Sequence, residues 1–442
     1  MKWRIDRRRA LGGLAAAGLL GGCATARSAI DPFVRRDGKG FTRRGKPYRY
    51  AGANAWYLAW LGSGEPVGDR TRLTRELERL KGLGVTNIRL LAGAEEGPLR
   101  NAIRPGFVDR AGKYNLALLE GLDFALAEMA KRDMTAVLYV SNFWEWSGGF
   151  MTRLYWATSS YLEMNDPARP WPAFADMASG FYANAQAMQG YFDYLGTLIG
   201  RTNTINGRRY AADPTIMAWQ LGNEPRPGAT PEAIEAHLPS YYKWIDDSAA
   251  MIRKLAPNQL VSLGMEGTIA ANGREDIVLR AHRNIDYLTA HIWPLNWGWV
   301  DGKDLAGTWE AGKAKVEDYL STHIRLAEKA GKPLVFEEFG FPRDGELYDP
   351  WVPITFRERY YRLIYAAAET HSSDAGGSVS GTNFWGWSGE ARAQHGDHRF
   401  QPGDTQYMGD PPHEPQGWYG NFDSDENIGA TIREHSARFG TV

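Results

Sequence analysis

The sequence predicts an α/β protein built on a (β/α)8 barrel, with enlarged loops at the C-terminal ends of its strands. From residue 48 onward, short β-rich runs alternate with amphipathic helical stretches, as expected of βα units around a parallel sheet. Eight such strand candidates can be counted. Two long loops rich in Trp, Gly, Pro and Asp, 143–179 and 388–421, each follow a strand. Active sites of this architecture lie on that face, and long loops in compact domains are usually functional.

The expected elements follow from the spacing of apolar residues. Leu73, Leu77, Leu80 and Leu83 recur at steps of three and four, which predicts a helix with one buried face. The expected strands are 48–55, 87–92, 135–142, 215–223, 259–266, 287–293, 333–339 and 382–387. The expected helices are 72–83, 116–132, 181–201, 241–255, 314–330, 356–370 and 427–439, the last of which closes the barrel.

The composition is that of an ordinary globular protein. Apolar residues make up 43% and charged residues 23% of the 442 positions, enough for a sizeable core. The formal net charge of −1 gives no electrostatic reason to bind nucleic acid. No repeat or linker interrupts residues 30–442, which predicts a single catalytic domain. The protein is expected to be a monomer. The 17 Trp and 21 Tyr residues are numerous, and part of them is expected to face a ligand.

The N-terminus predicts export from a bacterial cell. Arg7 to Arg9 precede an apolar stretch, 10–20, that is too short to span a bilayer. Residues 1–29 are therefore expected to be a signal and a short tether. Leu20-Gly21-Gly22-Cys23 resembles a lipobox, which predicts lipidation of Cys23 and attachment to a membrane. The alternative is a plain signal cleaved within 24–29. Cys23 is the only cysteine, so the mature domain has no internal disulfide.

Two strand ends carry glutamates. A mostly apolar strand, 218–222, runs into Asn223-Glu224-Pro225, and the proline ends the strand because it cannot donate to a central ladder. A second apolar strand ends in Glu337-Glu338-Phe339. Because neighbouring strand residues point to opposite faces, only one of these two glutamates is expected to face a pocket. The simpler alternative is that the glutamates are helix caps or surface ion pairs.

Two carboxylates at the mouth of a barrel fit the cleavage of glycosidic bonds. Retaining glycosidases hold such a pair about 5 to 5.5 Å apart. One carboxylate attacks the anomeric carbon, while the other protonates the leaving oxygen and then activates water. Repulsion between the two helps to keep the acid protonated.

Gly222-Asn223-Glu224-Pro225 and Glu338-Phe339-Gly340 together resemble glycoside hydrolase family 5, in particular its β-mannanase branch. The resemblance extends over nearly all of 45–436. It implies that Glu224 is the acid/base and Glu338 the nucleophile, with Glu337 in a supporting role. It also implies that Trp385 forms the floor of the central sugar subsite. Trp293 stands where the family usually has tyrosine.

Further site residues are expected around this pair. Arg89 can hold Glu338 ionised, and Asn223 can bind the 2-hydroxyl of the reacting sugar. His291 is expected to pair with a glutamate or else to be a core histidine. Residues on similar family segments complete the predicted substrate-binding set. They are Trp56, Asn142, Trp144, Glu266 and Trp293.

The expected activity is hydrolysis of β-1,4-mannosidic bonds in mannan or manno-oligosaccharides, with endo or exo action left open. The alternatives are a β-1,4-glucanase of the same family and a surface carbohydrate-binding protein without catalysis. No cofactor is expected, because no phosphate-binding or dinucleotide motif follows a strand. No metal is expected either, since His395 and His398 lie in a polar loop without cysteines or a helical histidine pair.

Overall fold

The computed structural model describes residues 31–440. The predicted export signal and Cys23 lie outside these residues. Among the helices of 31–440, none combines the length and the apolar character that crossing a membrane requires.

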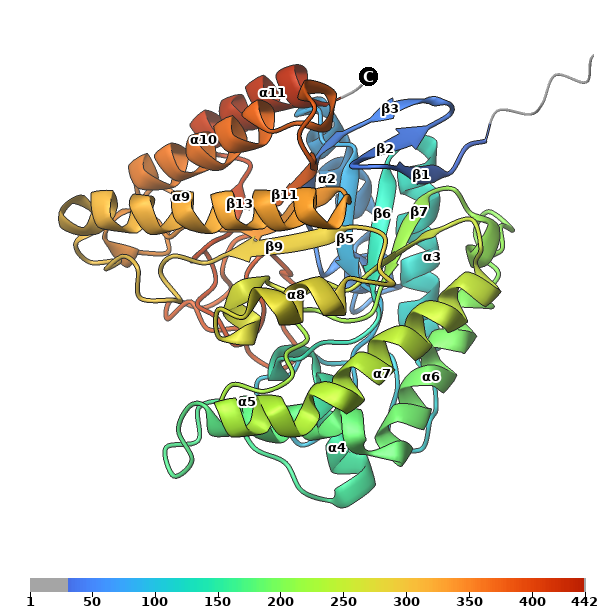
Figure 1. The fold of residues 1–442 in the computed structure, drawn as a ribbon. Helices are drawn as coiled ribbons and strands as arrows, with labels where there is room; N and C mark the ends of the chain where they lie inside the picture. Colours follow the sequence, from blue (N-terminus) through green and yellow to red (C-terminus); the bar gives the residue numbers. More distant parts are fainter. Residues whose placement is uncertain (1–30, 441–442) are drawn as a thin grey trace, which may run out of the picture.

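The central sheet is a parallel (β/α)8 barrel (Figure 1). Its strands pair in the order β8-β7-β6-β5-β4-β11-β10-β9. The first and last strands of this order, β8 and β9, meet and close the barrel. Backbone hydrogen bonds join them from the Asp286 amide to the Val261 carbonyl (3.0 Å) and from the His291 amide to the Glu266 carbonyl (2.9 Å). The barrel strands are β4 (Tyr50–Asn54), β5 (Asn87–Leu91), β6 (Thr135–Tyr139), β7 (Ile216–Gln220), β8 (Leu260–Ser262), β9 (Leu288–Ile292), β10 (Leu334–Phe339) and β11 (Val379–Phe384).

Each predicted strand overlaps a strand of the barrel, and the last one is displaced at both of its ends. β11 begins at Val379 and ends at Phe384, three residues before the predicted start and end. A side chain at Gly381 would collide with the Tyr50 ring, 2.4 Å from the position of a Cβ, so a glycine lies inside this strand. The Ser-Gly-rich start therefore lacks the apolar pattern of a strand. Trp387–Gly389 forms a separate short strand, β12, paired with β13 (Asn421–Phe422).

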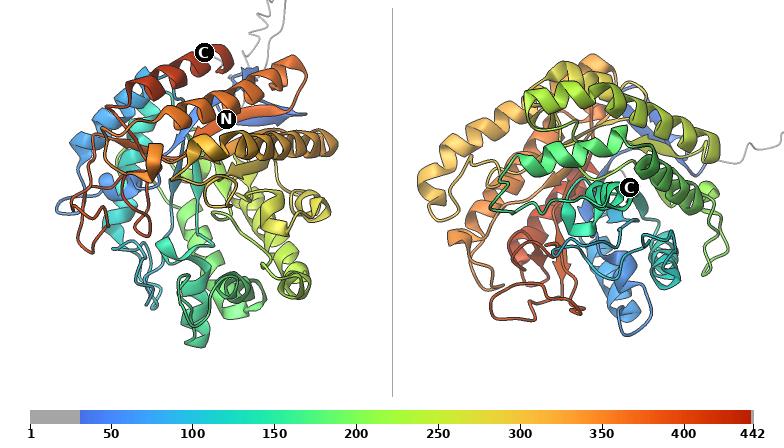
Figure 2. Two further views of the ribbon diagram at one scale, coloured as in Figure 1. Left: turned by 90° about the vertical axis from the view of Figure 1, so that its left-hand side faces the viewer. Right: turned by 90° about the horizontal axis from the view of Figure 1, so that it is seen from below.

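Helices surround the strands in both views of Figure 2. Two begin well before the predicted residue, at Pro231 instead of 241 and at Leu305 instead of 314. Thr230 caps the N-terminus of α7, which contains Pro239 and so includes a residue that normally interrupts helices. The early part of α9 contains Gly307 and Gly312, which weaken the helical pattern. The main helices are α2 (Arg70–Gly82), α3 (Leu116–Lys131), α6 (Ala185–Ile199), α7 (Pro231–Leu255), α9 (Leu305–Ala330), α10 (Thr355–Thr370) and α11 (Glu426–Phe439).

Shorter helices, which the sequence pattern does not reveal, lie in the connections. The long loop after β6 folds into two of them. These shorter helices are α1 (Leu58–Leu61), α4 (Gly149–Thr158), α5 (Ala173–Ala178) and α8 (Glu275–Ala281).

An N-terminal antiparallel sheet covers one end of the barrel. It consists of β1 (Val34–Asp37), β2 (Gly40–Arg43) and β3 (Lys46–Tyr48). Phe41 is buried and contacts the Tyr287 ring edge to face, at 5.4 Å between ring centroids. Because this sheet packs on residues near the starts of the strands, the opposite, C-terminal face is the one left for a site.

Candidate active site

A cavity of about 520 Å³ lies at the C-terminal ends of the barrel strands. Its size is in the range of small-molecule sites. Aromatic rings and carboxylates dominate its wall, and the residues come from the loops after several different strands. The lining residues are Trp144, Trp146, Met164, Trp171, Asn223, Glu224, Arg226, Glu266, Ile269, Asn272, Trp293, Asn296, Trp297, Glu338, Trp385, Pro411, His413 and Glu414.

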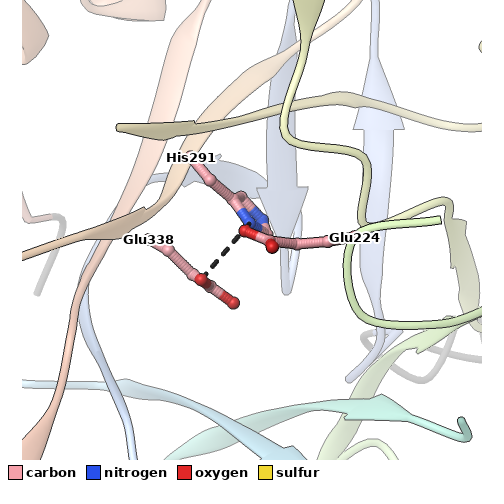
Figure 3. Close-up of side chains that lie close together, drawn as sticks. All are labelled: Glu224, His291 and Glu338. Atoms are coloured by element: carbon pink, nitrogen blue, oxygen red, sulfur yellow. Dashed lines mark hydrogen bonds and ion pairs between the residues drawn. The ribbon is translucent and has the colours of Figure 1, made fainter. Parts of the chain in front are cut away.

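Glu224 and Glu338 converge in this cavity together with His291 (Figure 3). One carboxylate oxygen of each glutamate and one ring nitrogen of His291 lie within 4.8 Å of one another. The glutamates are 114 positions apart in the chain, and the closed barrel brings their strand ends together. Their spacing is compatible with the short carboxylate separation of retaining glycosidases.

Both oxygens of Glu224 accept hydrogen bonds. Nε1 of Trp144 donates to Oε2 at 2.5 Å, and Nδ1 of His291 lies 2.7 Å from Oε1. The backbone of Glu224 is left-handed, with φ of 53°, which is uncommon for a side-chain-bearing residue and typical of strained functional sites. Burial works to raise the pKa of Glu224, but the bond to His291 and the charges of His291 and Arg226 outweigh it and lower the pKa.

Glu337 and Glu338 both lie inside the barrel, which corrects the premise of opposite faces, although only Glu338 lines the cavity, as expected. The pairing of β10 with β9 shifts register between Phe336 and Glu338, and such a bulge re-aims side chains. Glu338 reaches the cavity, whereas Glu337 is fully buried and accepts a bond from Gln220 at 2.7 Å. Glu337 therefore takes part in the polar network around the site and is not among the cavity-lining residues.

Arg89 is the centre of that network. Its guanidinium is fully buried and forms an ion pair with Glu338. It also donates to Asn223 at 2.7 Å. Nη1, which also binds Glu338, donates to Asn54 (3.0 Å), and Nε donates to Gln220 (2.8 Å). An arginine with a charged partner and three amide partners is fixed in position, so it fixes the orientation of Glu338 and Asn223 in turn.

His291 lies among three carboxylates. Nδ1 is 3.3 Å from Oε2 of Glu338 in addition to its contact with Glu224, and Nε2 is 3.4 Å from Oε2 of Glu337. Burial opposes a charge on this ring, but the carboxylates prevail and raise the pKa of His291 well above its ordinary value. The prediction that it pairs with a glutamate is confirmed.

Some of the predicted substrate-binding residues line the cavity and others do not. Trp144, Asn223, Trp293 and Trp385 line the cavity. Trp56 does not: it is buried in the core among the rings of Trp60, Trp146 and Tyr407, so its prediction as a substrate-binding residue is wrong.

Two other predicted residues act through neighbours. Asn142 is fully buried behind the cavity wall, and its side-chain oxygen accepts a bond from Asn223 at 3.2 Å. Glu266 lines the cavity, but both of its oxygens are bound by Arg226 at 2.6 Å each. Asn142 therefore does not reach a sugar directly, whereas Glu266 faces the cavity with its carboxylate already fixed by Arg226.

Sequence reasoning missed several lining residues, above all those of the loop 388–421. Pro411, His413 and Glu414 of this loop reach the cavity. Burial lowers the pKa of His413 to about 4 and raises that of Glu414 well above its usual range, with Asp410 and both site glutamates adding to the latter. The loop had been predicted to be functional from its length and composition, but no pattern singled out these residues. Arg226 could have been found from its position two residues after Glu224.

Three clustered donor atoms also raise the question of a metal. Glu224, His291 and Glu338 could each offer one ligand atom. However, Arg89 already supplies a positive charge to Glu338, and His291 is itself held charged by its neighbours. A divalent cation would be repelled by both, so the arrangement suits acid–base chemistry better. His395 and His398 lie apart from this centre, beside Asp404 and Asp349 respectively.

Comparisons with known proteins agree with this geometry. The family description "GH family 5 beta-mannosidase-like" matches residues 31–441. The chain belongs to glycoside hydrolase family 5. It is thus a retaining glycoside hydrolase. A solved family 5 mannosidase from Rhizomucor miehei is 33% identical, with a TM-score of 0.83 over 93% of this chain and 98% of that one.

Curated relatives are similar over most of their length. A putative mannan endo-1,4-beta-mannosidase 9 from Oryza sativa subsp. japonica is 29% identical over 84% of this chain and 85% of its own. Mannan endo-1,4-beta-mannosidase 7 from Arabidopsis thaliana is 28% identical over 80% and 77%. An endo-1,4-beta-mannanase structure from Rhizomucor miehei, at 21% identity and a TM-score of 0.64 over 92% and 98%, shares the fold.

The raised pKa of His291 makes a prediction about stability. An unfolded histidine loses its proton near pH 6.5, whereas the folded enzyme keeps it to higher pH. The stabilisation from this proton is complete below pH 6.5 and is lost as the pH rises through the folded pKa. The free-energy difference of unfolding between wild type and His291→Gln should therefore shrink above pH 6.5, by up to about 1.4 kcal/mol per pH unit. Urea unfolding at pH 6, 7.5 and 9 measures it, and a difference that stays constant would contradict a charged His291.

Proposed function

We propose that the protein is an exo-acting β-mannosidase, which removes terminal mannosyl units from β-1,4-manno-oligosaccharides by double displacement. Glu338 is the nucleophile and Glu224 the acid/base. The observation that carries this proposal is the cavity in which both carboxylates meet, with the loop 388–421 forming part of its wall.

Mannose is favoured as the sugar by the relatives. Those from rice and Arabidopsis are named mannan endo-1,4-beta-mannosidases, and the Rhizomucor miehei enzyme is a mannosidase, one mutant of which was solved with mannosyl-fructose. A β-glucanase would need the same two carboxylates, so the carboxylates alone do not decide between the two sugars. The similarity to mannosidases favours mannose.

In the first step, Glu338 attacks the anomeric carbon while Glu224 gives its proton to the leaving oxygen. Arg89 orients Glu338 and holds it as an anion. The side-chain nitrogen of Asn223 has two hydrogens, and one is committed to Asn142. The other is available for the 2-hydroxyl, where a hydrogen bond strengthens in the transition state. Because the pKa of Glu224 is lowered and that of His291 is raised, His291 supplies the proton that Glu224 passes on, across their 2.7 Å contact.

In the second step, the deprotonated Glu224 takes a proton from water, the water attacks the anomeric carbon, and the bond to Glu338 breaks. The two displacements together retain the configuration of the sugar. The rings of Trp385 and Trp293 lie edge to face, with centroids 5.8 Å apart, and give the reacting sugar an apolar floor on which its C–H faces can pack.

Exo action is supported by the loop 388–421. His413 lies parallel to the Trp146 ring, at 6.4 Å and 3°, and Trp146 in turn contacts Trp385. The loop thus packs beside the aromatic floor, against Trp146. The His413 and Glu414 side chains are only 16% and 11% exposed, which favours a loop that covers one end of the cavity over one that borders an open groove.

The product profile tests this proposal. Mannopentaose labelled at its reducing end should lose one mannose at a time from the other end, and free mannose should be the only unlabelled product from the first time point. The products are resolved by chromatography of early samples. Mixed mannobiose and mannotriose from the start would indicate endo cleavage, and activity on cello-oligosaccharides alone would indicate a glucanase.

We also propose that the enzyme is exported and held at a membrane through a lipid on Cys23. The support is the arginine-rich, apolar N-terminal sequence that ends in Leu20-Gly21-Gly22-Cys23. Expression in a bacterium with labelled palmitate should give a labelled enzyme in the membrane fraction, and Cys23→Ser should abolish the label. An unlabelled wild-type enzyme in the soluble fraction would contradict lipidation.

A further inference from the structure

Beside Glu224 lies an ion pair that the two displacement steps do not use. Nε and Nη2 of Arg226 each donate to one oxygen of Glu266 at 2.6 Å, in a bidentate fork. The side chains are 10% and 2% exposed. A bidentate pair of this kind is rigid and strong. The fork fixes the Glu266 carboxylate beside the acid/base, which points to a role for the pair beyond binding a sugar.

The pair is connected to the acid/base through an indole ring. The Arg226 guanidinium lies 5.0 Å from the centre of the Trp144 ring and 5.7 Å from that of Trp171. Phe174 stacks on Trp144 from another side, at 6.3 Å and 11°. The indole N–H of Trp144, held in this way, donates to Oε2 of Glu224. Cations over tryptophan faces are attracted to them, so Arg226 helps to fix the plane of the ring that fixes Glu224.

The charge of the pair matters as well as its shape. Arg226 alone would be a cation next to the acid, and a nearby cation favours the ionised form of a carboxyl group. Glu266 offsets that charge. Burial raises the pKa of Glu266 to about 7, with Arg226 opposing and Glu224 adding to the rise. Glu266 therefore carries its negative charge at pH values above about 7. In that range the acid must still keep its proton in order to act.

Other charged groups face Glu224 and share in its titration. They come from the strand ends of β5, β9 and β10 and from the loop 388–421, and they are unchanged by a substitution at the ion pair. These groups are Arg89, His291, Glu337, Glu338, His413 and Glu414.

We propose that the Arg226–Glu266 pair is a positioning unit for the acid/base: it holds the Trp144 indole against Glu224 and keeps an unbalanced positive charge away from it. This inference rests on the proposed role of Glu224. It assigns Glu266 to the protonation step of the leaving group, and not to recognition of the sugar.

Glu266→Gln tests the proposal with two substrates. Mannobiose has a leaving oxygen that needs a proton, whereas 2,4-dinitrophenyl β-mannoside has a leaving group that departs without one. For mannobiose, kcat/KM should fall about tenfold, a part of the 10²–10⁴-fold that general acid catalysis supplies. For the dinitrophenyl substrate it should change less than twofold. The alkaline limb of the pH profile on mannobiose should move to lower pH, because the uncompensated Arg226 favours ionised Glu224. Equal losses on both substrates with an unmoved limb would overturn the proposal.

Two further variants complete the design. Arg226→Lys keeps the cation but loses the planar fork, so it should slow mannobiose cleavage with little movement of the pH limb, and it keeps the test available if Glu266→Gln does not fold. An unchanged rate on mannobiose would contradict the positioning role. Glu275→Gln is the matched control, since Glu275 forms a forked pair with Arg325 on the surface, and it should leave all rates unchanged.

Glu224→Ala, assayed beside these variants, separates the two levels of the argument. Its kcat/KM should fall far more for mannobiose than for the dinitrophenyl substrate. If it loses activity on both equally, the role of Glu224 is wrong. If it behaves as expected while Glu266→Gln shows no preference, only the role of the ion pair is wrong.

Discussion

The buried ion pair between Arg89 and Glu338 is the interaction on which the rest of the site depends. Two carboxylates, Glu337 and Glu338, enter the barrel interior from one strand through a register shift. Without a buried cation, their charges would be too costly to hold away from water. Arg89 provides that cation, and its three nitrogens also donate to Asn54, Gln220 and Asn223. The same contacts that make the charges tolerable thus also set the geometry of the reaction.

His291 and Arg226 supply positive charge beside Glu224, as Arg89 does beside Glu338. Glu224 sits on a left-handed backbone and accepts bonds at both oxygens, so its orientation is as firmly determined as that of Glu338. The two glutamates nevertheless differ in their surroundings. Glu338 is held by an arginine, which stays charged at any working pH. Glu224 is held by a histidine and an indole. The histidine can exchange a proton with Glu224, and both contacts influence its pKa. This difference is what an acid/base and a nucleophile need.

Much of the fold could be predicted from the sequence, because alternating apolar patterns and the proline after Glu224 depend on local chemistry. The strand β11 was misplaced because its Gly381 is required by contact with Tyr50, and a contact between distant residues leaves no local signal. The same limit applies to the site. Glu224 stood out at a strand end, but the burial of Trp56 and the approach of His413 and Glu414 from residues 388–421 depend on how the barrel and its loops pack. The bulge that turns Glu337 inward is likewise set by pairing with β9.

The central claim is that Glu338 forms the bond to the sugar and Glu224 moves the proton. Rescue with azide tests it most directly, because the configuration of the product reports which carboxylate is missing. Glu224→Ala still forms the glycosyl-enzyme from dinitrophenyl β-mannoside, so azide should release β-mannosyl azide by a second inversion. Glu338→Ala lacks the nucleophile, so azide should displace the leaving group once and give α-mannosyl azide. The reverse assignment of the two products, or rescue of neither variant alongside near-normal activity of both, would contradict the account.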